Sequence, residues 1–186
     1  MLVTGAPGSG KSTLARQLSV ALRVPFVARD DIRGGLLLTA GAWGDSLERT
    51  PSADEAIEVF LGQIEQLLSQ GVSCVAEYLV RTHRPHDLER ILAAGDCVAI
   101  ITECENAIER FAERNRDDLL ISQPAVLDAI GFESVEAHTE SAIDRMRQAE
   151  SEMLQVFPVP VLKVDTTDGY DPPISEIVSF ATRTQL

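Results

Sequence analysis

A glycine-rich stretch near the start of the chain ends in a lysine and a serine and reads GAPGSGKS. It matches the spacing G-x-x-x-x-G-K-[ST] without a gap. Glycines let the backbone wrap closely around phosphates, with successive N–H groups pointing inward. A helix that begins there adds the positive end of its dipole. The pattern predicts a nucleoside triphosphate site made of Gly5, Ala6, Pro7, Gly8, Ser9, Gly10, Lys11, Ser12 and Thr13.

The residue types within this loop suggest separate tasks. Lys11 is expected to reach the β- and γ-phosphates, and the Ser12 hydroxyl to bind Mg²⁺. Thr13 can contact the α-phosphate. The alternative is a glycine-rich turn that matches by chance. An apolar stretch before the loop and an amphipathic pattern after it supply the strand and helix that the motif requires, so we favour the nucleotide site.

Two adjacent aspartates, Asp30 and Asp31, follow the second apolar stretch. Phosphoryl transfer asks little covalent chemistry of a protein, but it does need a carboxylate that orients and deprotonates the attacking hydroxyl. One aspartate could instead cap the helix that follows. Because there are two, both uses can hold.

Glu77 ends another apolar stretch. If that strand neighbours the first one, the carboxylate lies beside the glycine-rich loop, where it could hold Mg²⁺ through water or contact an acceptor. The alternative is a solvated carboxylate at a strand end.

Three arginines share one predicted helix: Arg110, Arg114 and Arg116. The guanidinium fork donates bidentately to phosphate oxygens. The alternative is a surface helix in which these arginines pair with acidic residues at helical spacing, namely Glu109, Glu113 and Asp117.

These four motifs together resemble the small AAA-type P-loop kinases grouped with chloramphenicol phosphotransferase and the zeta toxins. The resemblance implies that Asp30 is the general base and that Arg33 is the matching basic position, while Asp31 fills a variable slot. The string from Glu77 to Arg81-Thr82 is similar to one in the zeta toxins, which implies that Glu77 and Arg81 contact the acceptor.

The same resemblance implies a helical lid over residues 105–122. On it, Arg114 and Arg116 would stabilise the transferred phosphoryl group together with Lys11, and Arg110 would bind the nucleotide. Asp165 and Thr166 resemble the segment that packs against the base. Segments 34–52 and 123–155 are expected to shape the acceptor site. Trp43 could stack on an acceptor or lie in the core.

Apolar stretches alternate with amphipathic ones from end to end, which is typical of an α/β fold. We expect one domain over 1–186, a doubly wound five-stranded parallel sheet. Strands are expected at about 2–4, 25–28, 72–76, 97–102 and 159–164, with the second ending at 29–31. Helices are expected at about 11–22, 53–69, 84–94, 105–115, 123–130, 135–155 and 174–182, with a short helix and a loop in 34–51. The short first strand leaves open whether residues precede Met1.

The formal net charge of −13 argues against non-specific nucleic-acid binding. No apolar run of membrane-spanning length and no secretory signal are visible. The three cysteines show no zinc spacing, and His83 and His86 have no third ligand nearby. We therefore expect a cytoplasmic protein. A homodimer is left open.

The sequence thus predicts a phosphotransferase that moves the γ-phosphoryl group of ATP or GTP, with Mg²⁺, to a hydroxyl of a small molecule. The acceptor could be an antibiotic or nucleoside-like natural product, which would make the enzyme a resistance kinase. A nucleotide-sugar kinase similar to the zeta toxins and a polynucleotide 5′-hydroxyl kinase are alternatives. A regulatory NTPase without an acceptor is a different class, but the N-K-x-D and D-x-x-G motifs of such GTPases are absent from suitable places.

Overall fold

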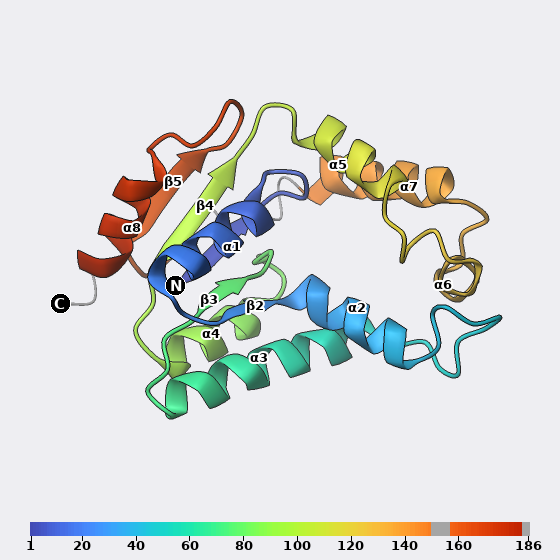
Figure 1. Cartoon of the computed structure of the whole chain (residues 1–186), viewed down its shortest axis with the longest axis horizontal. Coiled ribbons are helices and arrows are strands. Elements are labelled where there is room, and N and C mark those ends of the chain that lie inside the picture. The colour runs from blue at the N-terminus through green and yellow to red at the C-terminus, as the bar shows by residue number, and fades with distance from the viewer. Residues whose placement is uncertain (150–156, 184–186) are drawn as a thin grey trace.

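The computed structural model describes residues 1–149 and 157–183 and centres on one five-stranded sheet (Figure 1). Its strand order is β2-β3-β1-β4-β5, and all neighbouring strands pair in parallel. The strands are β1 Leu2–Gly5, β2 Phe26–Ala28, β3 Val75–Glu77, β4 Ala99–Glu103 and β5 Val161–Asp165. This topology confirms the predicted α/β fold class.

Eight helices are found in the described residues, and four of them cover the two faces of the sheet. Helices α1 and α8 pack on one face, whereas α3 and α4 pack on the other. The helices are α1 Lys11–Leu22, α2 Arg29–Thr39, α3 Ala53–Ser69, α4 Pro85–Ala94, α5 Ala107–Arg116, α6 Pro124–Ile130, α7 Val135–Ala149 and α8 Ile174–Arg183. Figure 1 shows α5, α6 and α7 gathered on the side of the molecule opposite α8.

Alternation along the strands builds a core on each face. Val3 and Ile100 pack toward α1 and α8, while Leu2 and Ile101 pack toward α3 and α4. Successive strand residues point to opposite faces, so a parallel sheet covered on both sides needs apolar residues in nearly every position. This packing fixes the carboxyl ends of β1, β3 and β4 at one edge of the sheet, where the glycine-rich loop begins.

The sequence patterns predict the first and last residues of two helices correctly. The α1 and α3 bounds match the predictions, and Ser52 explains where α3 begins, because its hydroxyl accepts the Glu55 N–H at 3.0 Å. The predicted ends of the strands and of the other helices differ from the observed ones by a few residues. The predicted helix over 135–155 is observed as α7 up to Ala149, and the predicted residues 150–155 lie outside the described part.

One boundary prediction was wrong. Residues 29–31 do not end β2 but form the first turn of α2, which continues through Gly34 to Thr39. The chain enters the helix directly after the three residues of β2, and Asp30 and Asp31 favour a helix start because carboxylates stabilise the positive end of its dipole. In the part of the chain that the structure describes, no helix has the length and apolar character needed to cross a membrane.

Candidate active site

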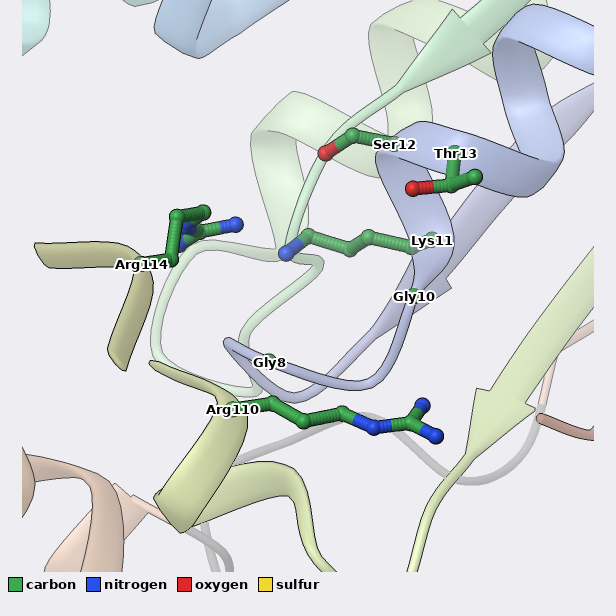
Figure 2. Close-up of a pocket in the computed structure, with 7 residues that line it drawn as sticks. All are labelled: Gly8, Gly10, Lys11, Ser12, Thr13, Arg110 and Arg114. Carbon is green, nitrogen blue, oxygen red and sulfur yellow. The ribbon is translucent and has the colours of Figure 1, made fainter. Parts of the chain in front are cut away.

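The glycine-rich loop joins β1 to α1 and lines a cavity of about 190 Å³ (Figure 2). Two of its glycines have positive φ angles, 81° at Gly8 and 78° at Gly10, which residues with a Cβ rarely adopt. At Gly8 a Cβ would also collide with the carbonyl oxygen of Ala107, at the start of α5. The lining residues are Gly8, Gly10, Lys11, Ser12, Thr13, Arg110 and Arg114.

Buried threonines from two strand ends hold this loop in place. The Ser9 hydroxyl lies 2.6 Å from the Thr102 hydroxyl, which in turn lies 3.2 Å from the Thr4 carbonyl oxygen. The Thr166 hydroxyl donates to the Ser9 carbonyl at 2.8 Å. Thr166 is thus bonded to the phosphate loop, and its packing against the nucleotide base stays a prediction. Sequence reasoning missed Thr102, although a polar residue near the end of the apolar β4 is a usable signal.

Glu77 lies directly beside the loop because β3 pairs with β1, with Val3 opposite Glu77. Its carboxylate lies 3.7 Å from the Lys11 amino group and accepts a hydrogen bond from the Ser12 hydroxyl at 3.1 Å. Glu77 is only 3% exposed, and burial raises the pKa of its carboxyl above the ordinary value of 4.5, with Lys11 opposing the shift. The alternative of a solvated carboxylate at a strand end is therefore wrong.

The Ser12 and Glu77 pair has the chemistry of a Mg²⁺ site. Mg²⁺ prefers hard oxygen ligands and is commonly held by one or two protein groups, with water and substrate phosphates completing its shell. A hydroxyl and a carboxylate 3.1 Å apart next to a phosphate loop fit that requirement. Among the described residues, no cluster of three or more His, Cys, Asp or Glu side chains offers a different metal site.

Two of the three predicted lid arginines reach the cavity. Arg110 and Arg114 line it, whereas Arg116 is exposed and does not. In Figure 2, Arg114 points from α5 toward the side of the loop where Lys11 lies, and Arg110 runs past Gly8 and Gly10. Arg110 donates to the carbonyl oxygens of Thr166 and Thr167 at 2.9 and 2.6 Å. It therefore joins α5 to the segment after β5.

The alternative of a salt-bridged surface helix is not supported within the described residues. None of the three arginines forms an ion pair there, although Glu109, Glu113 and Asp117 are at helical spacing. The Arg114 guanidinium instead lies 5.6 Å from the centre of the Phe111 ring. Their charge remains available for phosphates.

Asp30 lies near Glu77 because Ala28, two residues earlier, is opposite Glu77 in the sheet. Its charge contributes to the raised pKa of Glu77. The Asp30 side chain is 65% exposed and pairs with the Arg29 guanidinium at 2.9 Å. Asp31 points elsewhere, since it pairs with Arg16 at 2.6 Å on the surface. The two aspartates are thus separated, and of the two only Asp30 has a charge that contributes to the pKa shift of Glu77.

The remaining predicted residues lie around this centre. Asp165 accepts the Thr167 N–H at 2.7 Å, which shapes the turn after β5. Arg81 lies in the connection from β3 to α4, where no described residue forms an ion pair or a hydrogen bond with its side chain. Trp43 lies in the irregular segment after α2 and is 58% exposed, which excludes a core role.

The profile of the AAA domain family matches residues 1–141. The chain belongs to this family. No curated protein matches the sequence. As an AAA domain protein, the chain has its phosphate loop and the strand that ends at Glu77 inside the matched region. Of the described helices and strands, β5, α8 and the last part of α7 lie outside that region.

Solved structures with the same architecture cover nearly all of this AAA domain protein. A Chloroflexus aurantiacus J-10-fl protein assigned provisionally as a kinase has a TM-score of 0.69 and 22% identity, covering 98% of this chain and 96% of its own. A Sinorhizobium meliloti 1021 gluconokinase has a TM-score of 0.53 and 20% identity, covering 99% and 92%. A Janibacter sp. HTCC2649 sugar kinase has a TM-score of 0.55 and 15% identity, covering 99% and 92%. The fold is that of the P-loop kinases.

Proposed function

We propose that this protein is a kinase that transfers the γ-phosphoryl group of ATP or GTP to a hydroxyl of a small molecule. The observation that carries the proposal is the grouping of Asp30 and Glu77 at the end of the sheet where Lys11 and the phosphate loop lie. A phosphate loop alone binds nucleotide, but a separate aspartate next to it gives an acceptor hydroxyl its base.

The proposed transfer is a single displacement at the γ-phosphorus. The acceptor oxygen attacks the γ-phosphorus, the bond from that phosphorus to the β–γ bridging oxygen breaks, and the nucleoside diphosphate leaves with the bonding electron pair. The hydroxyl proton goes to the Asp30 carboxylate. Lys11 and Arg114 face the cavity and would stabilise the negative charge on the phosphoryl oxygens. Arg116 would need a movement of α5 to take part.

Ser12 and Glu77 would hold Mg²⁺, which supplies charge neutralisation for the β- and γ-phosphates when it is bound. In the structure itself, the Glu77 carboxylate is paired with the Lys11 amino group. The role of residues 105–122 as a lid that excludes water, and so limits hydrolysis, is part of this proposal. It is supported by the position of Arg110 and Arg114 over the loop.

Two likenesses suggest the class of acceptor. An antibiotic or nucleoside-like natural product follows from the likeness of the motifs to chloramphenicol phosphotransferase, and a nucleotide sugar from the likeness to the zeta toxins. The gluconokinase and the sugar kinase with this fold add hydroxylated sugars and sugar acids as candidates. Segments 34–52 and 123–155 would form the acceptor site. A cytoplasmic location is part of the same proposal.

Asparagine substitutions at the two adjacent aspartates test the reaction. Asp30→Asn should lower the transfer rate by about 10²- to 10⁴-fold, because the amide cannot take the proton. Asp31→Asn is the matched control and should stay within a few-fold of wild type, since Asp31 pairs with Arg16 on the surface. The measurement is γ-phosphate transfer to a panel of hydroxylated metabolites and antibiotics, with ATP and with GTP. A transfer rate for Asp30→Asn within about tenfold of wild type would show that Asp30 is not the base.

A further inference from the structure

Helices α2 and α7 each carry two basic side chains on one face, one turn apart on α2 and two turns apart on α7. Arg29 and Arg33 lie on α2, and His138 and Arg145 lie on α7. We call this group the α2–α7 basic cluster. The positive charges of Arg29 and Arg145 both act on Arg33, and those of Arg145 and Arg33 act on His138. The four side chains therefore share one electrostatic neighbourhood, although the two helices are far apart in the sequence.

Packing contacts connect the segments next to the cluster. A Cβ on Gly34 of α2 would lie 3.5 Å from Leu120, in the segment between α5 and α6. The His138 ring meets Phe132 edge to face, with centroids 5.1 Å apart. Asn115 of α5 donates to Thr139 of α7 at 3.3 Å. Figure 1 shows α2 on the side of the molecule where α5, α6 and α7 are gathered.

The cluster contains more positive charge than its surroundings neutralise. Arg29 pairs with Asp30, and within the described residues the Arg145 side chain forms one hydrogen bond, from Nε to the Ser141 carbonyl oxygen at 3.2 Å. Arg33 has neither an ion pair nor a hydrogen bond within the described residues. The nearby Asp118 carboxylate already accepts the N–H groups of residues 120 and 121 through one oxygen.

This lack of partners is unusual for so acidic a chain. The sequence has 29 acidic residues and only 16 lysines and arginines, so carboxylates are plentiful. Elsewhere, Arg84 and Arg90 each contact two of them. A half-buried arginine that faces other arginines is destabilising. Unfavourable groupings of like charge are expected mainly at functional sites, where a ligand can neutralise them.

The properties of Arg33 and His138 agree with an anion-binding site. Burial lowers the pKa of the Arg33 guanidinium, and Arg29 and Arg145 lower it further, with Asp30 opposing them. Burial also lowers the pKa of His138, and Arg145 and Arg33 add to that shift. The His138 Nδ1 is buried and has no hydrogen-bond partner. A negatively charged group would oppose the lowering of the pKa at both residues.

The cluster adjoins the proposed base. The charge of Asp30 acts both on Glu77, beside the phosphate loop, and on Arg33 of the cluster. We propose that the acceptor carries a carboxylate or phosphate group, which the α2–α7 basic cluster binds while the acceptor hydroxyl faces Asp30. This inference rests on the proposed kinase function and narrows its substrates to anionic alcohols. Arg33 and Arg145 would be the principal anion ligands.

Matched pairs of anionic and neutral alcohols test the inference. Binding of D-gluconate against D-glucitol, and of glycerol 3-phosphate against glycerol, is measured by calorimetry with saturating Mg²⁺ and ADP, which keeps the phosphate loop filled. At least one anion should bind about tenfold or more tightly than its neutral partner. Arg33→Gln and Arg145→Gln should each weaken that binding by about ten- to a hundredfold. The control is Arg147→Gln, also on α7, whose side chain pairs with Asp144 on the surface.

A stability measurement separates a ligand-binding role from a structural one. Without ligand, Arg33→Gln should melt at the same temperature as wild type or higher, because the change removes a repelling charge. A marked fall in melting temperature, equal binding of anionic and neutral alcohols, or unchanged anion binding in both variants would each overturn the inference.

Transfer assays with the same four alcohols distinguish the two proposals. Phosphoryl transfer to neutral alcohols, without any preference for anions, would support the kinase and overturn the anionic acceptor. Anion binding that needs Arg33 and Arg145, without transfer to any hydroxyl, would support the cluster as a binding site and contradict the kinase.

Discussion

The two sides of the candidate site differ in how their polar groups are satisfied. On the donor side, Lys11 pairs with Glu77, and Ser9 is bonded through both its hydroxyl and its carbonyl oxygen. On the proposed acceptor side, Arg33 has no partner among the described residues, and the buried His138 Nδ1 has none either. The donor side is thus completed by the protein itself, whereas the acceptor side leaves charge that the protein does not neutralise.

This difference follows from what each side must recognise. Phosphates are the same in every nucleotide, so a rigid loop with prearranged donors suits them without reorganisation. An acceptor site that pairs its own charges would compete with its ligand. The contrast leads to different expectations for substitutions. Substitutions on the donor side should reduce both stability and activity. Substitutions on the proposed acceptor side should reduce activity alone.

On the donor side, the largest effect is expected at Lys11. Lys11→Ala should lower transfer by about 10²- to 10³-fold, because the γ-phosphate loses a prearranged positive charge. It should also lower the melting temperature, since Glu77 is then buried without its cation. Combining it with Glu77→Gln should restore the melting temperature but not the activity. Transfer by Lys11→Ala within about tenfold of wild type would contradict the donor assignment.

Gly8 should be the next most sensitive position. Gly8→Ala should weaken nucleotide binding by at least about tenfold, because the new Cβ would collide with the Ala107 carbonyl oxygen in addition to straining the backbone. Gly71 offers a matched control, with a φ of 72° and open space around a new Cβ. Gly71→Ala should cost about 1–2 kcal/mol of stability and leave nucleotide affinity unchanged. Equal affinities for the two variants would argue against the contact.

The raised pKa of Glu77 predicts how nucleotide binding depends on pH. Below that pKa the carboxyl is neutral and cannot serve Mg²⁺, so Mg²⁺-dependent ATP affinity should fall by up to about tenfold for each pH unit of acidification. Because burial moves the pKa upward, the fall should begin above the pH expected for an ordinary glutamate. In the Glu77→Gln variant, the Mg²⁺-dependent ATP affinity should be low at every pH, and it should not change with pH. Titrations from pH 4.5 to 8 measure it, and an unchanged profile in the variant would contradict the assignment.

The smallest effect is expected at Trp43, outside both sides of the comparison. Its side chain is 58% exposed, so Trp43→Ala should change the free energy of unfolding by less than about 0.5 kcal/mol. If it stacks on the acceptor, the KM for the acceptor should rise a few-fold while kcat is unchanged. The control is Phe60→Ala, at a fully buried position, which should cost about 3–5 kcal/mol. A similar loss for Trp43→Ala would place the indole in the core.

The donor side could be predicted from sequence because its determinants are local. The loop, α1 and the strand that ends at Glu77 each carry their own pattern, and the parallel sheet brings Glu77 to the loop. The start of α2 was missed because β2 has only three residues, and Gly34 and Gly35 weaken the helical pattern. Sequence reasoning singled out Arg33 only through the family resemblance.

Nothing local could reveal the rest of the acceptor side. Arg145 follows Ser141 on a helix with a largely polar sequence, and that pattern is typical of a solvated surface. Its position near Arg33 depends on how α7 packs against α5 and how residue 120 packs against α2. Such contacts between distant segments leave no spacing in the sequence.

The close approach of Gly8 to Ala107 has a mechanical consequence for α5. A movement of this helix that preserves the contact is a rotation about its first turn, which places the fulcrum next to the phosphates. With a rise of about 1.5 Å per residue, Arg114 lies about 10 Å from that fulcrum and Arg110 only about 5 Å. A given rotation therefore displaces Arg114 about twice as far as Arg110. Such a rotation would let Arg110 keep its contacts with the segment after β5 while Arg114 moves relative to the phosphate loop.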